Sequence, residues 1–158
     1  MHRLSDGAAV LMAQTQEMSA DGSPGLLPAR LLIADDRARA RRALRALLGT
    51  HAEFELVGEA ADGQEALTAV EQLQPDIVIL DIRMPRLDGL AATRQIKARW
   101  PEIRVVAHSL AEELGAEALA AGADSFVPKG APVRQLLEAL RQGAVGAPAD
   151  ADGRPASE

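Results

Sequence analysis

Apolar residues along the chain fall into two alternating patterns, short continuous runs and stripes at helical spacing. The runs are typical of buried strands, and the clearest is 77–80, where Ile, Val, Ile and Leu stand together. The stripes repeat every three or four residues, as on one face of an amphipathic helix. Runs and stripes alternate five times: the runs lie at 31–34, 56–58, 77–80, 103–107 and 126–127, and the stripes at 40–48, 66–73, 90–100, 114–121 and 133–140.

This alternation predicts an α/β fold with a parallel sheet, because each strand is followed by a helix that returns the chain across the sheet. Strands that are apolar throughout fit such a sheet, which helices cover on both faces. We expect one folded unit over residues 29–142. Residues 1–28 and 143–158 show no sustained periodicity, so we expect a flexible N-terminal arm and a disordered tail or linker.

Composition narrows the classes of function. The chain has 158 residues and a formal net charge of −6, which disfavours general binding to nucleic acids or anionic membranes. It contains no cysteine, which excludes thiolate metal sites and thiol catalysis. No apolar run approaches the ~20 residues that a membrane-spanning helix needs. We therefore expect a soluble cytoplasmic protein that binds neither membranes nor, by this chain itself, nucleic acid.

Polar residues follow the predicted strands, where open parallel sheets bind their ligands. Asp35 and Asp36 follow the first strand and Asp81 the third, while Ser109 and Lys129 come after the fourth and fifth. Two carboxylates about 4 Å apart repel each other by roughly 4 kcal/mol at an effective dielectric constant near 20, so a cation is expected among them. A donor set made only of oxygen favours Mg²⁺.

The same crevice has the groups that phosphoryl transfer needs. The Lys129 ammonium can neutralise phosphoryl oxygens, the Ser109 hydroxyl can donate a hydrogen bond to one of them, and a carboxylate can be the nucleophile. No glycine-rich phosphate loop follows the first strand, which disfavours a dinucleotide or P-loop site.

Four segments follow the predicted strands or contain them: LLIADD at 31–36, DIRMPRLDG at 81–89, VVAHS at 105–109 and GADSFVPK at 122–129. In this order and spacing they resemble the receiver domain of two-component response regulators. The resemblance covers residues 30–142, and receivers that precede LuxR/NarL-type DNA-binding domains are the most similar subgroup. It implies a flavodoxin-like, doubly wound sheet of five parallel strands in the order 2-1-3-4-5, with five helices.

The resemblance also implies roles for the acidic residues. Asp81 would be the phosphoacceptor. Asp36 would bind Mg²⁺ directly, and Asp35 mainly through water. Asp81 and the backbone carbonyl of Arg83 would complete the set of metal ligands.

The remaining roles concern the phosphoryl group and the switch. Lys129 and Ser109 would bind the phosphoryl oxygens, and Ser109 with Phe126 would form the switch pair. Phe126 stands where tyrosine is frequent, and Gly130 follows Lys129 where proline is usual. Leu110 is larger than the residue common at its position, which raises the prospect of slower access to Asp81.

We therefore predict a signalling domain rather than an enzyme, at most taking phosphoryl groups from small donors and losing them by hydrolysis. Its partners would be a sensor histidine kinase or a phosphotransfer protein, and either a downstream partner or a second copy of the chain in a homodimer. One alternative is a receiver-fold scaffold that signals without phosphorylation. Another is a Mg²⁺-dependent aspartyl-phosphate phosphatase, which needs an acid two residues after its nucleophile, where this chain has Arg83.

Other polar residues have simpler interpretations. Asp62 and Asp88 each precede a glycine at a predicted helix start, and helix capping accounts for both. His108 is interpreted as a tolerated interior residue. Five arginines crowd the first predicted helix, and a solvated basic face is favoured over a docking patch for an acidic partner. These are Arg37, Arg39, Arg41, Arg42 and Arg45.

Overall fold

The computed structural model of the protein describes residues 27–145. Within this range five strands alternate with five α-helices, as the hydrophobic pattern predicts, and one short 3₁₀ helix precedes α5. Most of the arm and tail expected at 1–28 and 143–158 lies outside the described residues. The elements are β1 (Ala29–Ala34), α2 (Ala38–Leu48), β2 (Phe54–Ala60), α3 (Gly63–Leu73), β3 (Ile77–Leu80), α4 (Gly89–Arg99), β4 (Arg104–Ser109), η1 (Glu112–Leu114), α5 (Gly115–Ala120), β5 (Ser125–Pro128) and α6 (Val133–Val145).

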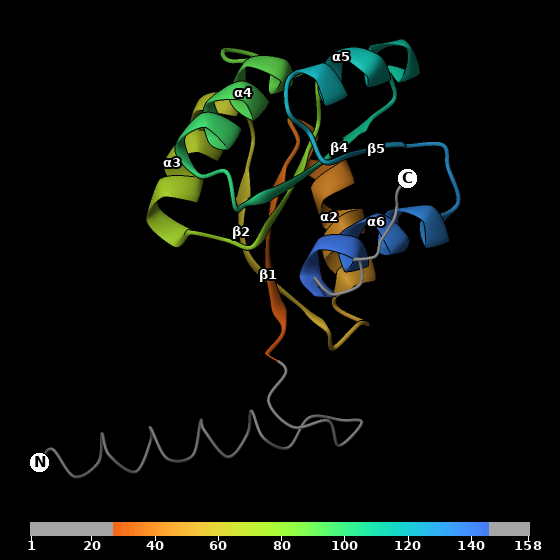
Figure 1. The fold of residues 1–158 in the computed structure, drawn as a ribbon. Coiled ribbons are helices and arrows are strands. Elements are labelled where there is room, and N and C mark those ends of the chain that lie inside the picture. The colour runs from red at the N-terminus through yellow and green to blue at the C-terminus, as the bar shows by residue number, and fades with distance from the viewer. Residues whose placement is uncertain (1–26, 146–158) are drawn as a thin grey trace, which may run out of the picture.

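The five strands form one parallel sheet in the order β2-β1-β3-β4-β5, which confirms the topology that the resemblance implies. Helices α3, α4 and α5 cover one face of the sheet, and α2 and α6 cover the other (Figure 1). Because every connection is a crossover between parallel strands, all five strands end at the same edge of the sheet.

The sheet divides the hydrophobic core into two layers. In β3 every residue is buried, and alternate side chains enter opposite layers. Val78 and Leu80 pack in the layer under α3, α4 and α5, while Ile77 and Ile79 pack in the layer under α2 and α6. This double burial explains why the strand reads as a continuous apolar run.

The predicted helix-capping residues are confirmed. Oδ1 of Asp62 accepts a hydrogen bond from the Glu65 N–H at 2.8 Å, and Oδ1 of Asp88 accepts one from the Ala91 N–H at 2.9 Å. After α5, Gly122 has a φ of +115°, a left-handed conformation that suits glycine at the end of a helix.

The fourth strand is longer than its apolar run suggests. The run ends at residue 107, but β4 continues through His108 and Ser109, which pair with Val127 and Pro128 of β5. Both residues therefore belong to the strand instead of following it. The pattern missed them because polar side chains at a strand's carboxyl end interrupt an apolar run without interrupting its backbone pairing.

Candidate functional site

The acidic residues that follow β1 and β3 are fixed by backbone hydrogen bonds between strands. The Asp35 N–H donates to the Ala60 carbonyl at 3.0 Å, and the Asp81 N–H donates to the Ala34 carbonyl at 2.9 Å. The strand pairing thus continues one residue past β1 and β3 and holds both carboxylates at the carboxyl edge of the sheet.

Three predicted metal ligands come together at this edge. One carboxylate oxygen each from Asp35, Asp36 and Asp81 lies within 4.8 Å of the others. Asp35 and Asp81 are only 2% and 6% exposed, whereas Asp36 is exposed. Burial strengthens the repulsion among the carboxylates, so this cluster needs positive charge nearby.

Lys129 supplies part of that charge. Its Nζ lies 2.5 Å from Oδ2 of Asp35 and 3.2 Å from Oδ2 of Asp81, and its side chain is only 13% exposed. One ammonium among three carboxylates leaves a formal charge of −2. The remaining charge and the hard oxygen donors fit a divalent cation such as Mg²⁺.

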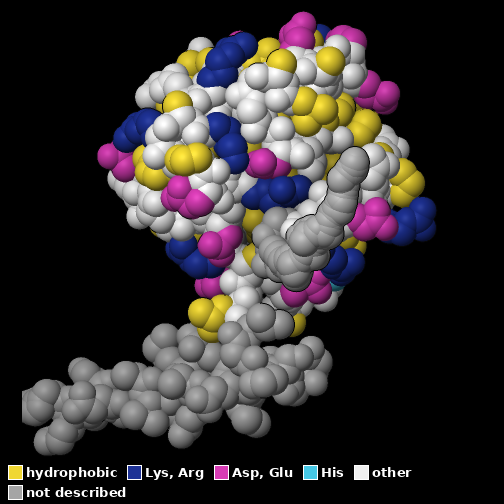
Figure 2. Space-filling view, in the orientation of Figure 1, with side chains coloured by type: hydrophobic (Ala, Val, Ile, Leu, Met, Phe, Trp, Pro, Cys, Tyr) yellow, Lys and Arg dark blue, Asp and Glu magenta, His cyan; other side chains and the backbone are white. Residues whose placement is uncertain are grey.

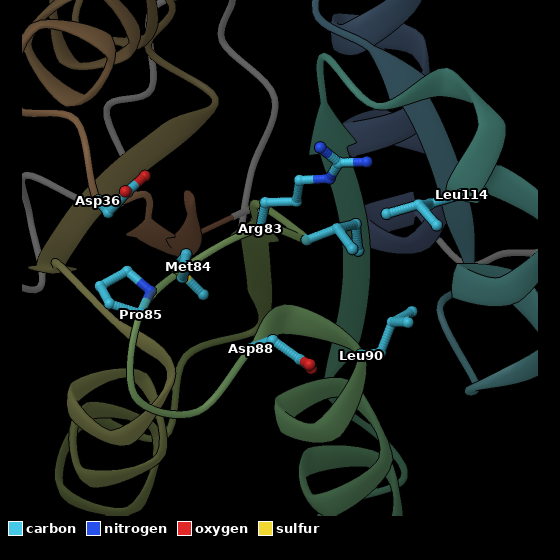
Figure 3. Close-up of a pocket in the computed structure, with 8 residues that line it drawn as sticks. Asp36, Arg83, Met84, Pro85, Asp88, Leu90 and Leu114 are labelled. Atoms are coloured by element: carbon cyan, nitrogen blue, oxygen red, sulfur yellow. The ribbon is translucent and has the colours of Figure 1, made fainter.

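The two adjacent aspartates differ in their protein contacts. Asp35 uses both oxygens within the protein, since Oδ1 accepts from the Arg37 N–H at 2.9 Å and Oδ2 accepts from Lys129. Asp36 extends into the open hollow beside the cluster (Figure 3). This contrast supports the expectation that Asp36 binds a cation directly and that Asp35 acts mainly through water or by positioning.

The loop between β3 and α4 packs closely against the proposed phosphoacceptor. The Arg83 N–H donates to Oδ1 of Asp81 at 3.4 Å, and the Gly89 N–H donates to the Ile82 carbonyl at 2.7 Å. A Cβ on Gly89 would lie 2.1 Å from the Asp81 carbonyl oxygen, so only glycine allows this approach.

An open hollow of about 590 Å³ lies over this loop and extends toward η1. Figure 3 shows the acidic side chain of Asp36 on one side and the apolar side chains of Leu90 and Leu114 on the other. The hollow leaves the loop after β3 and the Asp36 side chain open to solvent. Its lining residues are Asp36, Ile82, Arg83, Met84, Pro85, Asp88, Leu90 and Leu114.

The predicted switch residues lie on neighbouring strands. Ser109 is 2% exposed, and its Oγ accepts a hydrogen bond from the Ala111 N–H at 3.1 Å. Phe126 pairs with Ala107, two residues before Ser109, so the ring and the hydroxyl lie on the same face of the sheet. A Cβ on Gly115 would lie 3.1 Å from the Phe126 ring, which shows how closely α5 covers it.

His108 lies beside this site but on the opposite face of the sheet from Ser109. Burial, and secondly the positive charge of Lys129, lower the pKa of His108 from 6.5 to about 4, against a smaller raising effect of Asp35. Its Nδ1 is buried and has no hydrogen-bond partner among the described residues. The imidazole is therefore neutral at neutral pH, and the residue is half-buried.

The five arginines in and just before α2 are only partly a solvated face. Arg41 and Arg45 both form ion pairs with Glu59 of β2, and Arg41 also donates to the Asp35 carbonyl at 2.6 Å. Two of the five arginines therefore tie α2 to β2 beside the acidic cluster. The sequence gives no signal for this pairing, because only the parallel alignment of β1 and β2 brings Glu59 near the helix.

A further ion pair that the pattern does not predict joins two of the connections at the carboxyl edge of the sheet. The Arg83 guanidinium lies 2.8 Å from the Glu113 carboxylate, which links the loop after β3 to η1 after β4. Both side chains are about two-thirds exposed, so the pair contributes little to stability.

The chain belongs to the response regulator receiver domain family, whose sequence profile matches residues 31–141. Such receivers are signalling domains of two-component systems. The structure resembles the response regulator domain of Thermotoga maritima CheB, with a TM-score of 0.70 and 33% identity, covering 77% of this chain and 99% of that one. It also resembles a LuxR-family response regulator from Aurantimonas, with a TM-score of 0.68 and 30% identity, covering 72% and 82% of the two chains.

Curated relatives point to the same family. The chain is 49% identical over 106 residues to a protein-glutamate methylesterase/protein-glutamine glutaminase of Symbiobacterium thermophilum, which covers 65% of this chain and 29% of that protein. It is 35% identical over 114 residues to the response regulator GacA of Pseudomonas viridiflava, covering 71% and 53%. The chain thus spans about a third to a half of these relatives. Among residues 27–145, no helix has the length and hydrophobicity to cross a membrane.

Proposed function

We propose that this receiver accepts a phosphoryl group on Asp81 from the phosphohistidine of a sensor kinase or phosphotransfer protein. Mg²⁺ would be held by Asp35, Asp36, Asp81 and the Arg83 backbone carbonyl. The observation that carries the proposal is the contact of the Lys129 ammonium with both Asp35 and Asp81, inside a cluster of three carboxylates. We take residues 29–142 as the receiver unit and assign the arm and tail no part in phosphoryl transfer.

The proposed reaction is a displacement at phosphorus. An oxygen of the Asp81 carboxylate forms a bond to phosphorus as the bond to the histidine nitrogen breaks, and the departing imidazole keeps the electron pair and takes a proton from solvent. A bound Mg²⁺ would offset negative charge on the carboxylates and the transferred group. Lys129 would hold a phosphoryl oxygen through its ammonium, which is already positioned at Asp81.

Ser109 would sense the product. Its Oγ now accepts from the Ala111 N–H, and its own proton is available for a phosphoryl oxygen once Asp81 is modified. Donating that bond would draw the chain after β4 toward Asp81 and leave room for Phe126 to turn inward. The ring has no hydroxyl to satisfy, so its burial carries no polar penalty.

The surface that this movement would change lies over η1 and α5. Leu110 and Leu119 are 61% and 50% exposed there. Figure 2 shows hydrophobic side chains gathered at the upper right, where Figure 1 places α5. We propose that the phosphorylated form presents this surface to a downstream partner or to a second copy of the chain.

The two alternatives have less support. A phosphatase would need an acid where Arg83 stands, and a guanidinium cannot exchange a proton at neutral pH. A scaffold that does not use phosphate would have no need for a buried lysine between two carboxylates. The exposed position of Leu110 also weakens the argument that its bulk blocks Asp81.

Incubation with acetyl phosphate tests the proposed function without knowledge of the kinase. With Mg²⁺ the intact protein should gain the mass of one phosphoryl group, and with excess chelator it should gain none. A protein that remains unlabelled at millimolar Mg²⁺ and acetyl phosphate, or that is labelled equally in chelator, contradicts the proposal.

A further inference from the structure

The loop after Asp81 rests on the start of α3. A Cβ built on Gly63, the first residue of α3, would lie 1.9 Å from the Leu87 carbonyl oxygen. Any other residue at 63 would therefore push the loop away. This contact joins the loop that carries Arg83 to a helix that contributes none of the proposed metal or phosphoryl ligands.

The loop also holds an unusual backbone conformation at this contact. Arg86 has a φ of +64°, in the left-handed region of backbone conformation that residues other than Gly, Asn and Asp rarely adopt. Such a conformation persists only where surrounding contacts stabilise it. Arg86 follows Pro85, so the strained residue lies between the proposed metal ligand at 83 and the cap of α4 at Asp88.

Asp62 provides the stabilising contact. Its side chain is 5% exposed, and capping of α3 uses only one of its oxygens. The other oxygen, Oδ2, lies 3.4 Å from Nη1 of Arg86. A buried carboxylate requires compensation for lost hydration, and Arg86 supplies it from the loop. Capping alone therefore does not account for Asp62, in contrast to the expectation from the sequence.

We propose that Asp62 is a positioning residue for phosphoryl acceptance: through Arg86 it fixes the path of the loop that carries the Arg83 backbone carbonyl toward the acidic cluster. The inference rests on the proposed function, because the loop matters only if residue 83 helps to hold Mg²⁺. It adds a charged residue outside the acidic cluster to those that determine the affinity for the cation.

The test is a calorimetric Mg²⁺ titration of Asp62→Asn, with Glu65→Gln as the matched control. Asparagine caps helices as well as aspartate does, so α3 and the melting temperature should be preserved. Glu65 also accepts a backbone N–H at the start of α3, from Ala61, but is exposed. The control therefore removes the same charge from the same helix end and leaves Asp62 and Arg86 in place.

We expect Asp62→Asn to raise the Kd for Mg²⁺ about two- to fivefold, as suits a partly exposed ion pair. Glu65→Gln should leave the Kd within about 1.5-fold of the wild-type value, because an exposed charge contributes little. The difference between wild type and Asp62→Asn should shrink in 1 M salt, which screens the pair. An equal Kd in Asp62→Asn and wild type, or an equal increase in both variants, overturns the inference.

A double-variant cycle identifies the partner. If Asp62 acts through Arg86, Asp62→Asn combined with Arg86→Gln should bind Mg²⁺ no more weakly than the poorer single variant. Additive losses overturn the inference. Labelling of wild type by acetyl phosphate distinguishes failure of this inference from failure of the proposed function. If wild type is labelled and Asp62→Asn binds Mg²⁺ normally, only the role of Asp62 is wrong. If wild type is not labelled, the proposed function itself is wrong.

Discussion

The ammonium of Lys129 lies closer to Asp35 than to the proposed acceptor Asp81, with Nζ–Oδ2 distances of 2.5 and 3.2 Å. Asp35 also accepts the Arg37 N–H, so it is held on one side by the residue that precedes α2 and on the other by the residue that follows β5. The lysine is therefore anchored by a residue that does not react. This preorganisation places a positive charge beside Asp81 before any phosphoryl group arrives.

Replacing Lys129 by methionine should have opposite effects on two measurements. Mg²⁺ should bind more tightly, because the cation no longer shares the carboxylates with an ammonium. Phosphorylation by acetyl phosphate at saturating Mg²⁺ should slow at least about tenfold, because a charge that stabilises the transferred group is lost. Arg134→Met removes an exposed cation from α6 and should change neither quantity. Weaker Mg²⁺ binding together with an unchanged rate would contradict the role given to Lys129.

Asp36→Asn should weaken Mg²⁺ binding at least about tenfold in a calorimetric titration, since it removes the one exposed carboxylate of the cluster. Added Mg²⁺ should also raise the melting temperature of wild type by mass action, and much less that of the variant. Glu102→Gln, in an exposed turn at the opposite edge of the sheet, serves as the charge control. An unchanged titration in Asp36→Asn would remove Asp36 from the metal ligands.

Ser109→Ala should separate phosphorylation from switching. Labelling of Asp81 should remain largely intact, because the hydroxyl now accepts only the Ala111 N–H. In wild type, beryllofluoride with Mg²⁺ should shift the backbone NMR signals of η1, α5 and β5. The variant should lose those shifts around Phe126. Equal shifts in both proteins would show that the hydroxyl does not couple the two sites.

His108 should make stability depend on acidity. Because its pKa is about 4 in the folded protein and 6.5 in the unfolded chain, the unfolded chain binds the proton more readily between those values. Stability is therefore lost as the pH falls from about 6.5 to about 4. His108→Leu should lose less stability over this range in denaturant titrations without Mg²⁺. Parallel pH profiles for the two proteins would contradict the pKa.

Much of the fold follows from the sequence, because buried parallel strands and amphipathic helices leave strong periodic patterns. Val78 and Leu80 show the reason: a strand buried on both faces has no polar positions to confuse its pattern. The acidic cluster could also be predicted from the sequence, since the carboxyl ends of parallel strands meet at one edge of the sheet. The last residue of β4 could not be predicted from hydropathy, because the pairing of Ser109 with Pro128 depends on a neighbouring strand.

The unpredicted ion pairs depend on contacts between side chains of segments that are distant in the sequence. Arg83 meets Glu113 because β3 and β4 are neighbours in the sheet, and Arg86 meets Asp62 because the loop after β3 lies against the start of α3. Neither contact leaves a periodic pattern. The prediction that Asp62 caps a helix is correct but incomplete, since capping accounts for only one of its two carboxylate oxygens.

The central claim is that Asp81 is the phosphoacceptor, and site-specific labelling tests it most directly. Wild type and Asp81→Asn should be incubated with acetyl phosphate and Mg²⁺, and the mass of each intact protein should be measured. The acyl phosphate should then be trapped by reduction and its position found by peptide mapping. The account predicts one phosphoryl group in wild type, on the peptide that contains Asp81, and none in the variant. Labelling of Asp81→Asn to the wild-type extent, or trapping at Asp35 or Asp36, would contradict it.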